Sequence, residues 1–145
     1  MLKILTGALL VMLAMPNTAS AYFPSYFQEL FQTFPDCSNG TVKARIIARF
    51  NWADRATFYR GVSIRSIDYE SEQTIDSFGE PGVGAPIDRR YCKARAWLNN
   101  GKSNVVYYRI ERGMGLAGIG FKVEFCLPGY DRWHVYDGAC RVLRH

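Results

Sequence analysis

The sequence predicts an α+β domain in which one main helix packs on a curled antiparallel sheet of about four strands, held by two disulfides. Three observations predict this class. Apolar side chains recur every three or four residues over 41–54, they alternate at every second residue from 62 onward, and four cysteines are spread over the same region. One helix laid across one sheet buries both apolar faces in two layers.

The first 21 residues have the three parts of a secretory signal peptide. Lys3 gives a positive start, residues 4–15 are almost wholly apolar, and Ala19-Ser20-Ala21 has the small-x-small form of a cleavage site. The apolar run is well short of the roughly 20 residues that a membrane-spanning helix needs, although an uncut anchor is the alternative. We expect residues 1–21 to be removed, leaving residues 22–145 as a single domain without a transmembrane segment, periplasmic or secreted.

The charge balance of the predicted mature chain is moderately basic. The 145-residue sequence carries a formal net charge of +5, and removal of Lys3 with the leader lowers this charge to +4. A modest positive balance favours acidic surfaces such as envelope polymers. The cations are too few and too scattered to indicate a nucleic-acid-binding protein.

Two helices are predicted before the strands, a short one over 24–34 and the main one over 41–54. Ser38 and Asn39 precede the main helix and can cap its first turn. One face of this helix is apolar because its members are spaced by three or four residues: Val42, Ile46, Phe50 and Ala53. Two arginines lie along one flank of that face: Arg45 and Arg49.

Four strands are predicted after the helix, the last three as an antiparallel meander: 62–69, 90–98, 105–112 and 121–126. In the second strand one face carries Cys92, Ala94, Ala96 and Leu98, and the other carries Tyr91, Lys93, Arg95 and Trp97. Asn100-Gly101 then predicts a type I′ hairpin turn, which needs positive φ at both central residues. Residues 71–88 are expected to form a long polar loop. A helix followed by such strands resembles the cystatin-like order, a likeness of architecture that implies no function.

The four cysteines of an exported chain predict two disulfides, each contributing ~2–4 kcal/mol to stability. In the predicted architecture the helix start lies near the start of the second strand, which brings Cys37 close to Cys92. Cys126 ends the fourth strand at the opposite end of the sheet, leaving Cys140 as its partner. The two other pairings stay open, because sequence does not determine connectivity. A four-cysteine zinc site is disfavoured because no C-x-x-C pair is present, so no metal site is expected.

Residues 113–118 match G-x-G-x-x-G, the pattern of dinucleotide-binding loops. That pattern binds a pyrophosphate only where a strand precedes it and a helix follows it. Here the following residues, 120–125, alternate like a strand. We therefore interpret the match as a glycine-rich connection and expect no cofactor.

The densest chemical cluster lies near the C-terminus and contains Asp131, Arg132, Trp133 and His134. Aromatic and charged side chains in such a cluster can bind sugars, or they can pack a loop closed by a disulfide. His134 between two aspartates suggests catalysis, since a carboxylate can orient an imidazole. However, the cysteines are expected to be paired and no serine lies in a G-x-S-x-G elbow, so no catalytic residue is assigned.

Several stretches around the cysteines resemble a family of small exported bacterial proteins of unassigned function. They read Arg-Arg-Tyr-Cys-Lys-Ala-Arg-Ala over 89–96, Val-Glu-Phe-Cys over 123–126 and Gly-Tyr-Asp-Arg over 129–132. The resemblance implies a bacterial envelope setting, in the periplasm, and carries no activity. It also implies a motif core, which forms either an ion-pair network around the disulfides or a binding site: Arg89, Arg90, Asp131 and Arg132.

Together these observations predict an exported, non-enzymatic bacterial envelope protein with a binding or structural role on a protein or acidic polymer. The expected contact surface is the outer sheet face, extended by the tail loop at Asp131, Arg132, Trp133 and His134. Its members on the sheet are aromatic or basic: Tyr91, Arg95, Trp97, Tyr107 and Arg109. The competing view is that residues 22–36 cover part of this face. The alternative functions are a small hydrolase of an envelope polymer, centred on Asp131 and His134, and an inhibitor or immunity-type protein.

Overall fold

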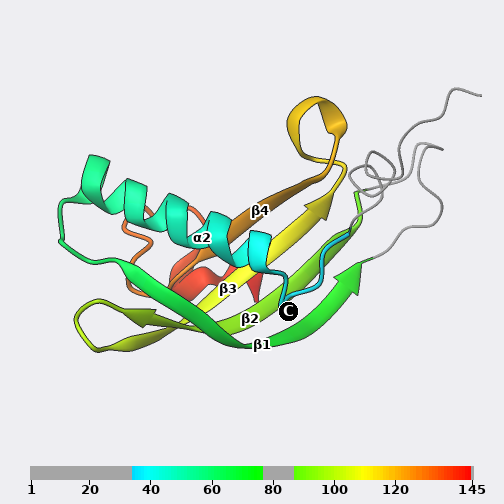
Figure 1. Cartoon of the computed structure of the whole chain (residues 1–145). Coiled ribbons are helices and arrows are strands. Elements are labelled where there is room, and N and C mark those ends of the chain that lie inside the picture. Colours follow the sequence, from blue (N-terminus) through cyan, green and yellow to red (C-terminus); the bar gives the residue numbers. More distant parts are fainter. Residues whose placement is uncertain (1–33, 77–86, 145) are drawn as a thin grey trace, which may run out of the picture.

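A computed structural model describes residues 34–76 and 87–144 of the chain. The predicted leader and nearly all of the expected 24–34 helix lie outside the described residues. Within them, one helix packs on an open four-stranded antiparallel sheet of order β1-β2-β3-β4 (Figure 1). The elements follow the chain as α2 (Gly40–Ala53), η1 (Asp54–Phe58), β1 (Ile64–Asp76), β2 (Arg89–Leu98), β3 (Ser103–Arg112), η2 (Leu116–Gly118), β4 (Phe121–Cys126) and η3 (Gly138–Leu143). The predicted α+β class is confirmed.

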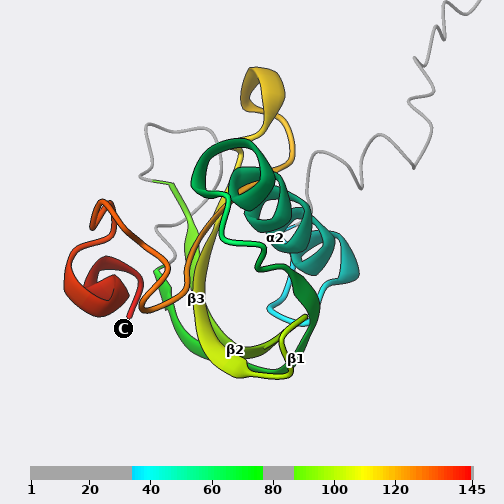
Figure 2. The ribbon, with the colours of Figure 1, turned by 90° about the vertical axis from the view of Figure 1, so that its left-hand side faces the viewer.

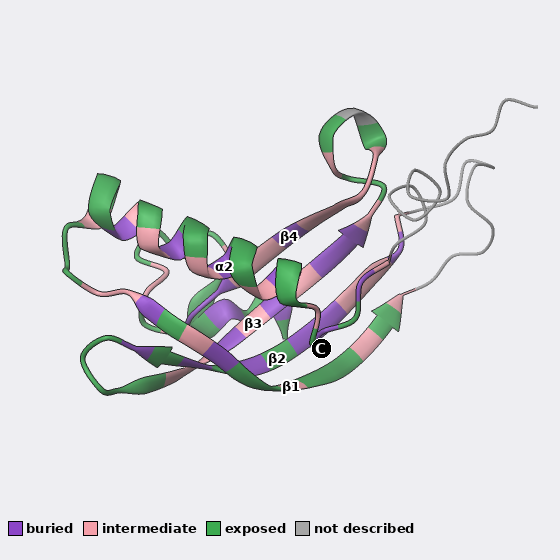
Figure 3. Ribbon diagram, viewed as in Figure 1, coloured by how far each residue is buried: buried purple, intermediate pink, exposed green. Residues whose placement is uncertain are grey.

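Helix α2 begins where the sequence places a cap. The Asn39 side-chain oxygen accepts hydrogen bonds from the backbone N–H groups of Thr41, at 2.9 Å, and Val42, at 3.3 Å. These bonds satisfy two donors that the first turn leaves without intrahelical partners. The predicted apolar face is buried at Val42, Ile46 and Phe50, which pack against the sheet (Figure 3). Its fourth member, Ala53, is half-buried.

The two flanking arginines of α2 attach the helix to the edge strand β4. The Arg45 guanidinium donates to the Phe121 carbonyl and the Arg49 guanidinium to the Val123 carbonyl, both at 2.8 Å. Arg45 also lies 4.2 Å from the centre of the Phe121 ring. Carbonyl groups at a sheet edge are a template for further strands, and these contacts cover two of them.

The sheet buries one face against α2, and the predicted alternation in β2 and β3 is confirmed there. Cys92, Ala94, Ala96 and Leu98 of β2 are buried, as are Val106, Tyr108 and Ile110 of β3. The Tyr108 hydroxyl donates to the Cys37 carbonyl at 2.6 Å. Burial raises the pKa of Tyr108 well above its ordinary value, so the phenol remains a donor at neutral pH.

Strand β1 is longer than the sequence predicts. It continues to Asp76, so residues 71–76, expected as the start of a polar loop, instead pair with residues 89–93 of β2. Apolar and polar residues do not alternate clearly over this stretch, because this part of the edge strand is largely exposed. Three register shifts interrupt the pairing, and Tyr69 takes a φ of 58°. Bulges of this kind bend a strand, which accounts for the curl of the sheet seen in Figure 2. Residues 77–86 of the expected loop lie outside the described part.

The β2–β3 hairpin is confirmed, but its turn differs from the predicted type I′ turn. Gly101 N–H donates to the Leu98 carbonyl at 3.2 Å, and Leu98 N–H donates to the Lys102 carbonyl at 2.9 Å. Three residues therefore form the loop, and Gly101, with a φ of 77°, is its one member in the left-handed region. The Asn99 side chain instead forms hydrogen bonds with backbone groups of Gly61 and Ser63 beside β1. These bonds hold Asn99 in the loop.

Both predicted disulfides are present, Cys37–Cys92 and Cys126–Cys140. The expectation that Cys126 lies at the opposite end of the sheet from Cys92 is wrong. Cys126 pairs with Tyr107, whose neighbour Tyr108 pairs with Cys92. Because β4 is only six residues long, it ends at mid-sheet, and successive β3 residues face opposite sides. The two disulfides therefore lie at almost the same level on opposite faces.

The G-x-G-x-x-G stretch connects β3 to β4 and contains one short 3₁₀ turn, η2, rather than the helix that dinucleotide binding requires. A Cβ atom on Gly115 would lie 1.9 Å from the Ile119 carbonyl oxygen. Glycine is needed at this position because the backbone itself makes the close approach.

We predict that Asn39→Ala lowers the free energy of unfolding by about 1 kcal/mol, since two N–H groups of the first turn lose their acceptor. Urea denaturation of the oxidised protein measures this change. Ser38→Ala is the matched control, because among the described residues the Ser38 hydroxyl bonds only the exposed Asp36 carboxylate. Equal losses for the two variants would contradict the capping role of Asn39.

Candidate functional site

The outer face of the sheet, expected as an open contact surface, is partly covered. Tyr91 is buried, with 5% of its surface exposed. Tyr107 is half-buried and packs against the cluster of Cys126, Cys140 and Leu143. The segment that covers Tyr107 is therefore the C-terminal η3, which Figure 2 shows on the side of the sheet opposite α2. The competing prediction, that residues 22–36 cover part of this face, falls almost wholly outside the described residues. For Tyr91 the expected exposure is wrong, because sequence alternation assigns a face but does not show what packs on it.

Charges on the outer face neutralise one another. Arg109 forms ion pairs with Glu111, at 3.2 Å, and with Glu124. Glu111 also accepts from Arg89 at 3.0 Å, and Glu124 accepts from Lys122 at 2.7 Å. Arg109, one of the predicted contact residues, has a side chain that is only 18% exposed, and its charge is paired within this network.

Two of the predicted contact residues are exposed near the β2–β3 hairpin. Trp97 is 38% exposed, and the Arg95 guanidinium lies 5.9 Å from its ring centre. Arg95 also donates to the Ser103 hydroxyl at 3.4 Å. This pair is what remains of the predicted strip of aromatic and basic residues.

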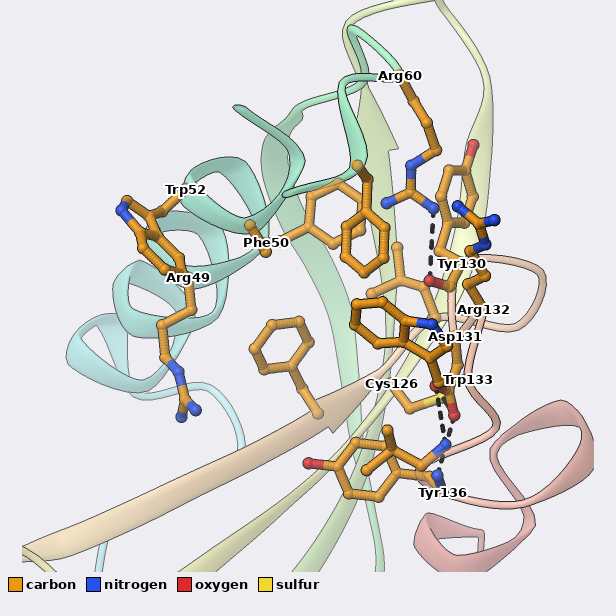
Figure 4. A pocket seen from close by; sticks show the side chains of 15 residues that line it. Arg49, Phe50, Trp52, Arg60, Cys126, Tyr130, Asp131, Arg132, Trp133 and Tyr136 are labelled. Atoms are coloured by element: carbon orange, nitrogen blue, oxygen red, sulfur yellow. Dashed lines mark hydrogen bonds between the residues drawn. The ribbon is translucent and has the colours of Figure 1, made fainter. Parts of the chain in front are cut away.

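A groove of about 410 Å³ lies instead between the end of α2, with η1, and the loop that follows β4 (Figure 4). We call it the aromatic–arginine groove. Its lining is Arg49, Phe50, Trp52, Ala53, Phe58, Arg60, Phe125, Cys126, Leu127, Tyr130, Asp131, Arg132, Trp133, Val135 and Tyr136. Seven of the fifteen lining residues are phenylalanine, tyrosine or tryptophan, and three are arginine.

The helix-side wall depends on a buried carboxylate. Asp54, 2% exposed, accepts from the Arg60 guanidinium at 2.9 Å and from Val62 N–H at 3.0 Å. These bonds stabilise a sharp turn of the chain after η1 and hold the Arg60 side chain in place. Its guanidinium then lies 4.5 Å from the centre of the Phe58 ring and 5.0 Å from that of Tyr130. The cation thereby bridges the aromatic rings of both walls.

The opposite wall is shaped by Asp131. Its two carboxylate oxygens accept from the backbone N–H groups of Val135, at 3.0 Å, and Tyr136, at 2.9 Å. The closed loop presents Trp133, whose ring centre lies 5.1 Å from that of Phe58 across the groove. Trp133 is nevertheless 64% exposed, so a large part of its indole faces solvent.

The floor and rim combine apolar and donor groups. Phe50 and Tyr130 meet edge to face with centroids 5.7 Å apart, closing the inner end. Burial, reinforced by the charge of Glu124, raises the pKa of Tyr136, so its hydroxyl remains a donor at neutral pH. Arg49 and Arg132 lie at the rim on opposite walls. The arrangement can stack flat rings and attract anions, and it has no evident nucleophile.

The groove brings together three of the four predicted tail-loop residues: Asp131, Arg132 and Trp133. His134 lies in an adjoining cavity of about 210 Å³, which it shares with Asp137. Within the described residues, no hydrogen bond joins the His134 side chain to a carboxylate. Asp137 is engaged by Gly138 N–H and Arg141, so the acid–base pair expected of a hydrolase is not assembled here.

Sequence reasoning missed the helix-side members of the site: Trp52, Phe58 and Arg60. Their signal is the density of aromatic residues over 50–60, together with the exposed position of Trp52 away from the predicted apolar face. These residues come close to residues 125–136 only because the chain turns back after η1. Such a turn leaves no periodic pattern in the sequence.

The motif core implied by the family resemblance divides among three places in the fold. Arg90 donates to the Pro35 carbonyl at 2.8 Å and lies 4.6 Å from the Phe34 ring centre, close to the Cys37–Cys92 disulfide. Arg89 belongs to the outer-face ion pairs. Asp131 supports the loop closed by Cys126–Cys140, and Arg132 is exposed at the groove.

No protein-family model, no curated protein and no solved structure matches this chain. In the ranges described, no helix has the length and apolar composition needed to cross a membrane. The same ranges hold no group of three or more histidine, cysteine or carboxylate side chains that is arranged to bind a metal ion.

The outer-face network predicts an acid-dependent loss of stability. Burial alone raises the pKa of Glu124, but the hydrogen bond from Lys122 and the charges of Arg109 and Lys122 outweigh it and hold this pKa below its ordinary value. A depressed carboxyl pKa stabilises the fold above the unfolded-state value, and this stabilisation is lost as the pH falls through the folded value. The free energy of unfolding should therefore decline below about pH 4.5, near the ordinary glutamate pKa.

Urea denaturation between about pH 6 and pH 3 measures this effect on the wild-type protein and on Glu124→Gln. The variant should lose less stability over that interval, because its amide does not titrate. Asp68→Asn is the control, since the Asp68 carboxylate is exposed and, within residues 34–76 and 87–144, accepts only from the Ser66 hydroxyl. An unchanged pH dependence in Glu124→Gln would contradict the prediction.

Proposed function

We propose that the protein is an exported, non-enzymatic binding protein of the bacterial envelope, periplasmic or secreted, which holds its partner in the aromatic–arginine groove. The signal-peptide layout of residues 1–21 supports export. The two disulfides fit an oxidising compartment, where such bonds form and persist. The partner is a protein or an acidic polymer of the envelope.

The observation that carries this proposal is an exposed tryptophan held rigidly over a preformed groove. Trp133 keeps 64% of its surface in solvent although Asp131 fixes the loop that bears it. Burying the exposed face of an indole against a partner is favourable, and tryptophan is enriched among residues that dominate binding energy. The groove volume of about 410 Å³ lies within the ~300–1,000 Å³ typical of ligand sites.

The polar groups of the groove favour recognition over catalysis. Both oxygens of Asp131 are occupied by backbone N–H groups, and Asp54 is buried beneath Arg60. Neither carboxylate is placed to exchange a proton with a ligand. The arginines, in contrast, reach the rim, where they can orient an anionic group without reacting with it.

The outer sheet face is the competing site, and Trp97 represents it. In-cell cross-linking of the exported protein, with quantitative mass spectrometry of attached proteins and polymers, compares the two sites. We expect Trp133→Ala to lower the specifically retained envelope component about tenfold, or ~1.4 kcal/mol. Trp97→Ala, the matched control, should retain it.

Both substitutions remove exposed side chains, so thermal unfolding should show each variant folded. Loss of retention in Trp97→Ala alone would assign binding to the sheet face. Retention unchanged by Trp133→Ala would remove the groove as the site.

A further inference from the structure

We propose that the groove binds a chain of carboxylated sugars, an inference that rests on the proposed function and specifies its ligand. Three features of the groove point to this ligand: two exposed indoles along it, two guanidinium groups that have no carboxylate partner among the described residues, and a strand edge already closed to peptides. Each restricts the chemistry of the occupant in a different way.

The first feature is a pair of tryptophans on opposite walls. Trp133 is 64% exposed on the loop, and Trp52 is 63% exposed at the end of α2. Both line the groove; Figure 4 shows Trp133 over it and the Trp52 indole on the outer side of α2, at the far margin of the helix-side wall. A pyranose ring has an apolar C–H face that stacks on a flat aromatic ring while its hydroxyl groups remain solvated. Trp133 offers such a platform over the groove and Trp52 a second one at its margin, so separate exposed rings suit a chain of several sugars better than a single small molecule.

The second feature is uncompensated positive charge. Among the described residues, no carboxylate lies within ion-pair distance of Arg132 or Arg49, whereas Arg60 is paired with Asp54. Arg49 donates from one nitrogen to the Val123 carbonyl, which leaves its other donors available. The three groove arginines outnumber Asp54 and Asp131 by one, and Asp131 is already satisfied by two N–H groups. A guanidinium recognises a carboxylate through two parallel hydrogen bonds, so the groove favours an acidic over a neutral glycan.

The third feature argues against an extended acidic peptide. Such a peptide commonly binds by adding a strand to an exposed sheet edge. The edge that borders the groove is β4, and two of its carbonyls already accept from Arg45 and Arg49 on α2. Strand addition there would have to break both bonds and displace the helix. A sugar chain needs no backbone ladder and can lie across the rings.

Isothermal titration calorimetry with hexamers of galacturonate and of mannuronate tests the inference. The methyl ester of the galacturonate hexamer is the matched ligand, because it keeps the rings and removes the charge. We expect at least one acid hexamer to bind, its methyl ester or neutral counterpart to bind about tenfold more weakly, and the affinity to fall with added salt.

Variants locate the interaction. Arg132→Gln and Trp133→Ala should each weaken binding of the acid hexamer about tenfold, and Trp52→Ala should weaken it by a smaller factor. Arg95→Gln and Trp97→Ala are matched controls on the outer sheet face and should leave the affinity unchanged. Equal binding of ester and acid would overturn the role of charge, and equal binding to the control variants and to Arg132→Gln would overturn the role of the groove.

Two further outcomes separate this inference from the proposed function. If neither hexamer binds while Trp133-dependent retention in the envelope persists, the sugar chain is wrong and the groove remains a binding site. If poly-glutamate binds as tightly as the hexamers, an acidic protein segment is the ligand and the inference is overturned. Tighter binding of the hexamers than of poly-glutamate, lost in Trp133→Ala, supports it.

Discussion

The pairing register of β2, β3 and β4 determines where both disulfides form, and the rest of the architecture depends on it. Cys92 lies opposite Tyr108 and Cys126 lies opposite Tyr107, so the two cysteines face opposite sides of the sheet. One disulfide consequently attaches the start of α2 to one face, and the other attaches the C-terminal segment to the reverse face. A slip of one residue would exchange the faces and separate both cysteine pairs, because side-chain direction in a strand has a period of two.

The groove follows from this arrangement. Leu127 and Tyr130 pack in the core with Phe50 of α2, whereas η3 packs on the outer face through Cys126–Cys140, so the intervening loop passes around the β4 edge, beside the end of α2 (Figure 2). Asp131 closes that loop through backbone bonds, and Asp54 does the same for the chain after η1. Both carboxylates therefore act as internal acceptors that shape a wall. The aromatic rings between them are presented to solvent by rigid supports, which lowers the entropic cost of ordering them on binding.

Arginine has three separate uses in this fold. Arg109 forms ion pairs on the outer face. Arg45 donates a hydrogen bond to an exposed carbonyl of the edge strand β4 and covers the Phe121 ring. Arg132 lies at the groove and has no carboxylate or carbonyl partner in the part of the chain that the structure describes. A basic net charge by itself therefore says little about a binding surface, since most cations are already committed. The position of Arg132 at the groove is therefore the reason to expect an anionic ligand there.

Features that arise from local periodicity or spacing could be predicted from the sequence. The apolar face of α2, the buried alternation of β2 and β3 and the limits of β4 belong to this group, because neighbouring residues report the same face or the same element. The two predicted disulfide pairings are correct, but the position expected for Cys126, at the far end of the sheet, is wrong. The candidate site could be predicted only on its loop side, from the density of aromatic and charged residues at Asp131–Trp133. Tertiary structure decided the rest: Arg60 meets Tyr130, some seventy positions away, Trp52 lines the same groove as Trp133, and Tyr91 is buried although its face was expected to be open. Such contacts leave no periodic trace, since they arise from the path of the chain around a sheet edge and from what that path covers.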